Sequence, residues 1–154
     1  VRLGEFHADV RAVPRLTEPT DLLIVATKAA GLPAALDRVA IAPRLVLPLL
    51  NGLDHLAVLR ERWPDRVCAA VIRVESDRPE PGVIVQTSPF LRVDVAPETP
   101  DTTAAAHLLR AAEIPTKVGD SEAQVMWGKL VRLNALACTT TNSGSRTTIN
   151  APCG

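Results

Sequence analysis

Two kinds of hydrophobic pattern alternate along the chain and predict strands that alternate with helices. Apolar runs within residues 22–26, 44–52 and 66–77 are typical of strands buried on both faces of a parallel sheet. Between them, residues 32–39 and 53–63 place their apolar side chains at helical spacing. The order strand, helix, strand, helix, strand predicts an α/β fold whose partly parallel sheet is built with right-handed crossovers.

Shorter elements complete the pattern on both sides of this core. A short strand or hairpin is expected around residues 10–13. Residues 82–88 and 91–97 alternate apolar with polar positions, and we expect them to form an antiparallel pair at the edge of the sheet. A helix over residues 101–112 and a short strand over residues 115–119 follow.

The composition is ordinary for a soluble globular protein and argues against several kinds of partner. The chain has 154 residues, of which 47% are hydrophobic, enough for one domain with a sizeable core. Its 17 basic and 17 acidic residues give a formal net charge of +0, which argues against binding nucleic acid or a membrane surface through bulk electrostatics. No apolar run approaches the length of a membrane span, and the first residues contain no signal-peptide core.

The cysteine and histidine positions predict neither disulfides nor a metal site. The three cysteines are far apart and fit a reduced, cytoplasmic setting: Cys68, Cys138 and Cys153. The three histidines lie neither beside a cysteine nor in a two-histidine helical pattern, so we expect no bound metal: His7, His55 and His107.

Two polar positions follow directly after predicted strands. In open parallel sheets, ligands bind outside the carboxyl ends of the strands. Lys28 lies at one such end and offers a charged donor to a cofactor or substrate, or is simply a solvated lysine beyond the strand. Asn51 and Gly52 lie at another, where they either place an amide at a site or only form the turn into the next helix.

Lys129 lies in an apolar stripe of the last predicted helix, which we expect to run from Ser121 to about Cys138. Val125 and Met126 precede it by one turn and Leu133 follows by one turn. Desolvation there would lower the pKa of the lysine and favour a role as proton donor near neutral pH. The alternative is a lysine whose stem packs on the apolar stripe while its ammonium reaches water.

Ser121 and Gln124 have the spacing of a capping box, which sets the start of this helix. Asn134 is five residues beyond Lys129, about 140° away around an ideal helix. The two side chains are therefore not expected to share one helix face.

Taken in order, four segments resemble ketopantoate reductase (2-dehydropantoate 2-reductase). They are "TDLLIVATKA", "LPLLNGLDHL", "VIRVES" followed by "PGVIVQTSPF", and "GDSEAQVMWGKLVRLNALA", and the similarity runs from about Thr20 to Cys138. The resemblance implies a Rossmann-type domain followed by an all-helical domain. It also implies reduction of a small 2-keto acid, ketopantoate to pantoate in pantothenate biosynthesis, by hydride transfer from NADPH.

The resemblance implies a role for four residues. Lys129 in "WGKL" matches a lysine that protonates the carbonyl oxygen of the substrate as a general acid. Lys28 in "VATK" matches a lysine that contacts the cofactor, and Asn51 in "NG" matches an asparagine near both nicotinamide and substrate. The family places an asparagine one turn after the lysine; here that position is Leu133, and the adjacent Asn134 is the candidate for substrate binding.

The chain also departs from the family pattern at both ends. The family begins with a strand and a G-x-G-x-x-G turn that holds the cofactor pyrophosphate, and these 154 residues contain no such turn. The final stretch "TTTNSGSRTTINAPCG" is polar and has too few apolar residues to build a helical core. We therefore expect residues 1–118 to be the distal part of an incomplete Rossmann-type domain, and residues 119–154 to be the first helix of a helical domain plus a polar tail.

Three functional hypotheses follow from these residues. The first is a truncated ketopantoate reductase, possible as a homodimer because a partner would cover the open strand edge of its incomplete sheet. The second is a non-catalytic, Rossmann-like remnant that acts as a binding or interaction module. The third is a related dehydrogenase that acts on another 2-keto or hydroxy acid.

Overall fold

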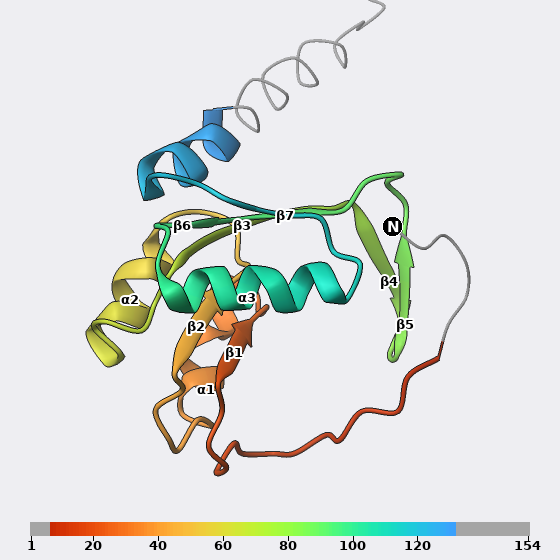
Figure 1. The fold of residues 1–154 in the computed structure, drawn as a ribbon. Helices are drawn as coiled ribbons and strands as arrows, with labels where there is room; N and C mark the ends of the chain where they lie inside the picture. Colours follow the sequence, from red (N-terminus) through yellow and green to blue (C-terminus); the bar gives the residue numbers. More distant parts are fainter. Residues whose placement is uncertain (1–6, 132–154) are drawn as a thin grey trace, which may run out of the picture.

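The computed structural model describes residues 7–131 and contains the alternating strands and helices that the sequence predicts (Figure 1). In chain order the elements are β1 (Leu22–Val25), the short 3-10 helix η1 (Ala29–Gly31), α1 (Leu32–Leu36), β2 (Leu45–Pro48), α2 (Asp54–Arg62), β3 (Ala69–Arg73), β4 (Ser76–Glu80), β5 (Val83–Gln86), β6 (Arg92–Ala96), α3 (Pro100–Ala111) and β7 (Thr116–Val118). A further helix covers residues 122–131. The predicted fold class, a partly parallel α/β sheet, is confirmed, whereas the proposed domain boundary after residue 118 stays a prediction.

Five of the strands form two ladder systems, β1–β2 and β3–β6–β7, which are joined at a single point, and β4 and β5 form a separate hairpin. β1 and β2 pair in parallel, and β6 pairs antiparallel with β3 and parallel with β7. Between the ladders, an isolated parallel bridge joins Val46 of β2 to Val67, just before β3. The sheet is therefore partly parallel, with the purely parallel part formed by β1 and β2.

A proline ends the pairing between β2 and the segment leading into β3. The Val46 N–H donates to the Arg66 carbonyl at 2.6 Å, and the Cys68 N–H donates to the Val46 carbonyl at 3.2 Å. Backbone donors on one side of a strand recur every second residue, so the next donor toward this neighbour would belong to Pro48. Proline has no N–H, and the regular ladder does not continue.

Helices cover both faces of the sheet. On β2, Leu45 and Leu47 pack in a cluster with α3, whereas the intervening Val46 packs in a second cluster with residues of α1 and α2. β3 alternates in the same way, because Ala70 lies in the cluster with α3 and its neighbours pack toward α2 and the 122–131 helix. Figure 1 shows α3 below strands β3, β6 and β7, and the 122–131 helix above them.

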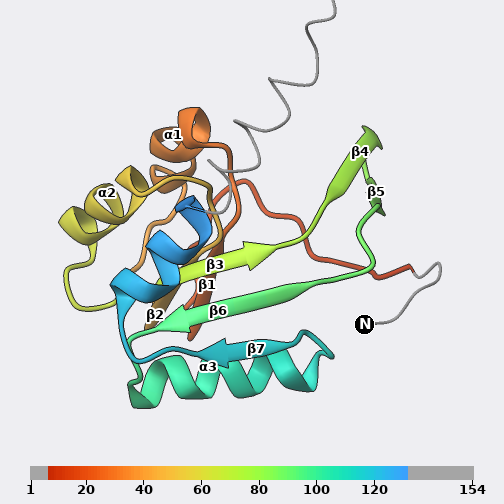
Figure 2. The ribbon, with the colours of Figure 1, turned by 90° about the horizontal axis from the view of Figure 1, so that it is seen from above.

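The expected antiparallel pairing of residues 82–88 with 91–97 is wrong. β5 pairs with β4, and β6 pairs with β3. The segment 66–77, expected as one strand, instead divides into β3 and the beginning of β4, and Gly82 forms the two-residue turn to β5 with φ at +87°. Figure 2 shows the resulting β4–β5 hairpin extending beyond the ends of β3 and β6.

Two smaller expectations also differ from the structure. Residues 10–13 form no strand or hairpin, and Val10 is 82% exposed, so this segment packs no apolar side chain at that position. The first helix ends at Leu36 rather than at Val39, because Val39 forms an isolated parallel bridge with Leu16.

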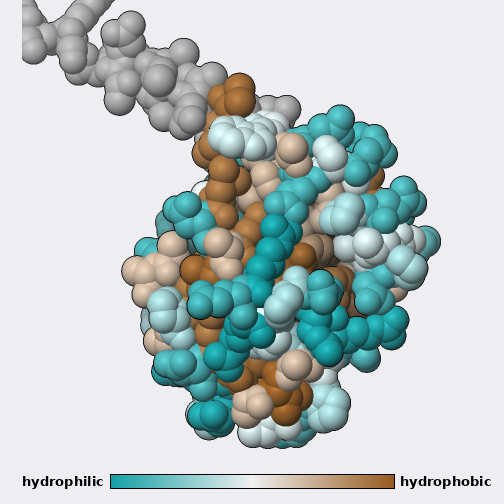
Figure 3. Space-filling model, turned by 90° about the vertical axis from the view of Figure 1, so that its left-hand side faces the viewer, coloured by the Kyte–Doolittle hydropathy of each residue, from teal (hydrophilic) through white to brown (hydrophobic). Residues whose placement is uncertain are grey.

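The surface of the described residues is mixed in polarity. On the side where α2 lies, hydrophilic residues form much of the surface, with hydrophobic residues visible between them (Figure 3). Among residues 7–131 there is no helix with the length and apolar character needed to cross a bilayer.

Three contacts determine where the 122–131 helix begins. The Ser121 hydroxyl accepts a hydrogen bond from the Gln124 N–H at 3.3 Å, so Ser121 caps the helix as its sequence predicts. Both nitrogens of the Arg60 fork donate to the Glu122 carboxylate, at 3.1 and 2.5 Å, and tie the helix to α2. The Gly119 N–H donates to the Val95 carbonyl at 2.8 Å and anchors the preceding turn to β6.

Gly119 also allows this helix to approach the sheet closely. A Cβ atom at this position would lie 2.9 Å from a methyl group of Val125. Valine is stiff at χ1 in a helix, so the helix itself must shift to make room. We therefore expect Gly119→Ala to lower the free energy of unfolding by about 1–3 kcal/mol, the usual scale for overpacking, in urea denaturation followed by circular dichroism.

Gly128→Ala is the matched control, because a Cβ at this position of the same helix meets nothing within 4 Å. Alanine is the better helix former, and we expect a stabilisation of up to about 1 kcal/mol. Equal effects from the two substitutions would contradict the close packing at Gly119.

Candidate functional site

The predicted strand-end positions lie where the parallel strands β1 and β2 finish. β1 ends at Val25, and Lys28 follows it as the exposed residue that precedes η1. β2 ends at Pro48, and Asn51 and Gly52 lie in the segment that leads into α2, with Gly52 at a φ of +86°. This positive φ requires a residue such as glycine, and it turns the chain sharply between strand and helix.

Lys129 joins this strand end to β3. Its ammonium donates to the Asn51 side-chain oxygen at 2.7 Å and to the Ile72 backbone carbonyl at 2.9 Å. Asn51 lies in the loop after β2, and Ile72 lies on β3. The lysine therefore bridges β3 and the segment after β2.

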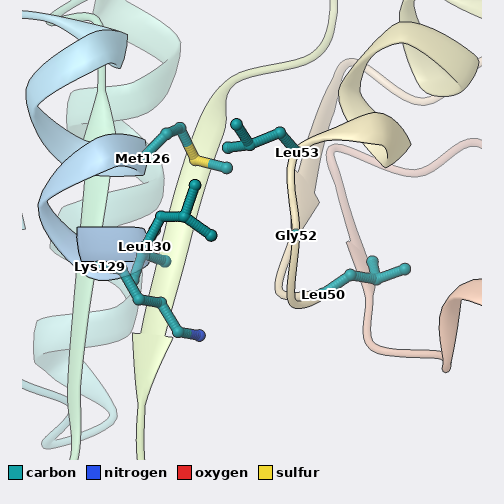
Figure 4. A pocket seen from close by; sticks show the side chains of 7 residues that line it. Leu50, Gly52, Leu53, Met126, Lys129 and Leu130 are labelled. Atoms are coloured by element: carbon teal, nitrogen blue, oxygen red, sulfur yellow. The ribbon is translucent and has the colours of Figure 1, made fainter. Parts of the chain in front are cut away.

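A small, mainly apolar pocket surrounds the stem of Lys129 (Figure 4). Its volume is about 20 Å³, and its lining residues are Leu50, Gly52, Leu53, Val71, Met126, Lys129 and Leu130. Figure 4 shows Met126 reaching toward Leu53, while Lys129 extends from the helix past Leu130. The lysine thus supplies the cationic group of an otherwise apolar pocket.

This environment perturbs the acidity of two side chains. Burial lowers the pKa of Lys129 below its ordinary value of 10.5, and the nearby charge of Arg73 lowers it further. Burial also lowers the pKa of His55, with Asp54 opposing the shift and Lys129 adding to it. Lys129 is therefore a stronger acid than an exposed lysine, and His55 resists taking up a proton.

Several buried polar atoms around these strand ends have no hydrogen-bond partner among the described residues. They are the Thr27 hydroxyl oxygen, both ring nitrogens of His55 and the Nε atom of Arg73. Sequence reasoning assigned no role to His55 or Arg73. The available signals were that His55 lies in the first turn of the helix after Asn51, and that Arg73 shares a strand face with Val71 by alternation.

Other reactive groups in the described part of the chain do not form a centre of their own. The Cys68 thiol donates to the Val46 carbonyl at 3.3 Å, and burial raises its pKa to about 12, so it stays protonated near neutral pH. Within residues 7–131, no group of three or more His, Cys, Asp or Glu side chains is arranged to hold a metal ion.

The structure brings together two of the four residues that the sequence predicted for the site. Lys129 and Asn51 share a hydrogen bond. Lys28 lies after the neighbouring strand, and its ammonium forms no hydrogen bond within residues 7–131. Asn134 lies outside the described residues, and the roles of all four stay predictions.

The pKa of Lys129 can be measured directly, because the chain contains only three lysines. We expect the ¹³Cε signal of Lys129 to titrate below 10.5 in NMR, and Arg73→Gln to raise that pKa by removing a neighbouring charge. Because the folded chain then holds this proton less tightly than the unfolded chain, the folded state gains stability as pH rises from the folded pKa toward 10.5. Titration of Lys129 at or above 10.5 would contradict a desolvated ammonium.

Comparison with known proteins identifies a family and a fold. The family model described as "Ketopantoate reductase PanE/ApbA" matches residues 1–97. No curated protein matches the chain.

Solved structures of related fold cover most of this chain. The 2-dehydropantoate 2-reductase of Porphyromonas gingivalis W83 has a TM-score of 0.69 and 23% identity, over 80% of this chain and 46% of its own. The PanE/ApbA family ketopantoate reductase of Ralstonia eutropha JMP134 has a TM-score of 0.61 and 28% identity, over 72% of this chain and 38% of its own.

A D-mandelate dehydrogenase shares the same fold. Its ternary structure with NADH and anilino(oxo)acetate has a TM-score of 0.63 and 19% identity, over 75% of this chain and 40% of its own. This chain therefore spans less than half the length of each of these three proteins.

Proposed function

Because the chain belongs to the ketopantoate reductase PanE/ApbA family, we propose that it takes part in the NADPH-dependent reduction of ketopantoate to pantoate. The observation that carries this proposal is the hydrogen bonding of Lys129. An ammonium has three N–H groups, and two of them are directed to Asn51 and Ile72. The third has no acceptor within residues 7–131, and in this proposal it donates to the keto oxygen of a bound substrate.

In this proposal Lys129 acts as the general acid. Bound NADPH would supply the hydride that reduces the keto carbon. The Lys129 ammonium donates one proton to the keto oxygen, so that the carbonyl becomes a hydroxyl group and the lysine becomes a neutral amine. Asn51 and Ile72 hold the ammonium nitrogen in place, and the lowered pKa of Lys129 favours release of the proton.

The residues after β1 fit a contact with the cofactor. Lys28 offers an exposed ammonium without a hydrogen bond to the described residues, and the neighbouring Thr27 hydroxyl is buried without a partner. A dinucleotide carries both phosphate charges and ribose hydroxyls that such donors recognise. Lys28 would therefore help to hold NADPH, and Asn51 would lie near both the nicotinamide and the substrate.

The rest of the proposal concerns the setting of the reaction. We expect a place in pantothenate biosynthesis, a cytoplasmic location, a homodimeric assembly and a role for Asn134 in substrate binding. A related dehydrogenase acting on another 2-keto acid is the second candidate, which the shared fold of D-mandelate dehydrogenase favours. A non-catalytic binding module is the third, and it predicts no turnover at all.

Lys129→Met tests the catalytic role. It keeps the length and the apolar stem of the side chain and removes the proton. We expect kcat for ketopantoate to fall about 10²-fold or more, the usual scale for losing a general acid, when NADPH consumption is followed in the full product of the reading frame. An unchanged kcat with a native circular dichroism spectrum would exclude Lys129 as the proton donor.

Lys28 provides a contrast, and an exposed arginine provides the control. Lys28→Met should raise the KM for NADPH and leave kcat close to that of the parent protein, because Lys28 faces the cofactor in this proposal. Arg78→Gln should change neither constant, because Arg78 is exposed on the β4–β5 hairpin, which extends beyond the ends of β3 and β6 (Figure 2). A loss of kcat in all three variants would indicate a general effect of lost positive charge.

A further inference from the structure

Two arginines surround one buried aspartate on the sheet beside Lys129. Arg73 of β3 donates from Nη1 to one carboxylate oxygen of Asp94 at 2.5 Å, and Arg92 of β6 donates from Nε to the other at 2.7 Å. The Asp94 side chain is 8% exposed, the Arg73 side chain 22% and the Arg92 side chain 46%. The aspartate is thus a fixed support, and the two arginine side chains remain partly exposed.

Alternation along β3 places Arg73 on the face that carries the candidate site. Ala69 and Val71 of β3 belong to the cluster that contains Val125 and Met126 of the 122–131 helix. Side chains two residues apart on a strand lie on the same face, so Arg73 follows Val71 along this face.

Alternation along β6 places Asp94 and Arg92 on the same face of the sheet. On β6, Ala96 belongs to that cluster, and Asp94 and Arg92 follow it at intervals of two residues. The three charged side chains therefore continue the surface that Val71 and Lys129 contribute to the pocket.

Arg73 and Lys129 are close enough to influence each other. The Lys129 ammonium is hydrogen-bonded to the carbonyl of Ile72, the residue before Arg73, at 2.9 Å. The Arg73 charge also lowers the pKa of Lys129. A ligand that contacts the ammonium therefore lies beside the Arg73 guanidinium.

The positively charged groups beside Asp94 have more hydrogen-bond donors and more positive charge than this one carboxylate can satisfy. Arg73 and Arg92 both donate to the single carboxylate of Asp94, and Lys129 lies close enough to Arg73 for the guanidinium charge to lower its pKa. Arg73 directs one nitrogen to Asp94, and its buried Nε has no partner among the described residues. Buried donors are normally satisfied, so this guanidinium keeps hydrogen-bonding capacity for a further acceptor, and its positive charge favours an anionic one.

We propose that Arg73 binds the carboxylate of a 2-keto acid substrate while Lys129 faces its keto oxygen, with Asp94 orienting Arg73. The proposal rests on the proposed function and names a residue that selects its substrate class. In a 2-keto acid the carboxylate is bonded directly to the keto carbon, so the two groups require donors that lie side by side. The planar guanidinium matches a carboxylate with two parallel N–H groups, which a ketone without a carboxylate would leave unpaired.

Calorimetric titration of the full chain with two ligands tests this role. The ligands are ketopantoate and its lactone, which has the same carbon skeleton and no free carboxylate. We expect Arg73→Gln to raise the Kd for ketopantoate about tenfold or more, as loss of a charge-assisted hydrogen bond predicts, and to leave the Kd for the lactone unchanged. Arg73→Lys should recover only part of the affinity, because lysine keeps the charge and loses the fork.

Arg78→Gln is the matched control, because Arg78 is an exposed arginine on the β4–β5 hairpin. We expect it to bind both ligands as the parent chain does. Equal weakening of both ligands by Arg73→Gln would make Arg73 a structural residue and overturn the proposal. An unchanged Kd for ketopantoate, or no binding of ketopantoate by the parent chain, would also overturn it.

The outcome can be separated from that of the proposed function. Arg73-dependent binding of ketopantoate without NADPH-dependent turnover would support the carboxylate site and contradict the reductase activity. Turnover with an unchanged KM for ketopantoate in Arg73→Gln would support the activity and overturn the carboxylate site.

Discussion

The absence of one backbone N–H group shapes the candidate site. Pro48 cannot donate a backbone hydrogen bond, so the pairing of β2 with the segment that leads into β3 is limited to Val46 and does not continue along β3. The Ile72 carbonyl and the Asn51 side chain remain as acceptors on β3 and after β2, and the Lys129 ammonium bridges them. The position of the lysine thus follows from the place where the sheet stops pairing.

The 122–131 helix brings Lys129 to these acceptors through contacts made far from the lysine itself. The ion pair of Arg60 with Glu122 and the close approach at Gly119 act on the first turn of the helix. Because a helix is stiff, its first turn determines the position of Lys129 two turns later. The candidate general acid therefore depends on packing between α2, β6 and the beginning of that helix.

Much of this arrangement could be predicted from local sequence patterns, and the part that could not depends on tertiary contacts. Apolar runs followed by polar residues located Lys28 and Asn51 at strand ends, and the apolar stripe singled out Lys129. The hydrogen bond between Lys129 and Asn51 spans 78 positions, and no local pattern specifies such a contact. Arg73 was missed because alternation assigns a side chain to a face without saying which helix covers that face.

The predicted strand pairing was wrong for a related reason. Alternating side chains indicate that residues 82–88 and 91–97 are strands, and they do not indicate which strands are neighbours. The Pro-Gly pair at 81–82 was the local signal for the turn that joins β4 to β5 instead.

The β4–β5 hairpin has a further consequence for how copies of this protein meet. β5 exposes Ile84 at 67%, a residue that would favour pairing with a strand of another molecule. The partner strand β4 contains three charged residues and Pro79 within its sequence SDRPE, and its ladder is irregular between Asp77 and Glu80. Charges, proline and an irregular ladder each oppose the edge-to-edge association that leads to aggregation, so the hairpin can extend into solvent with apolar residues on one strand.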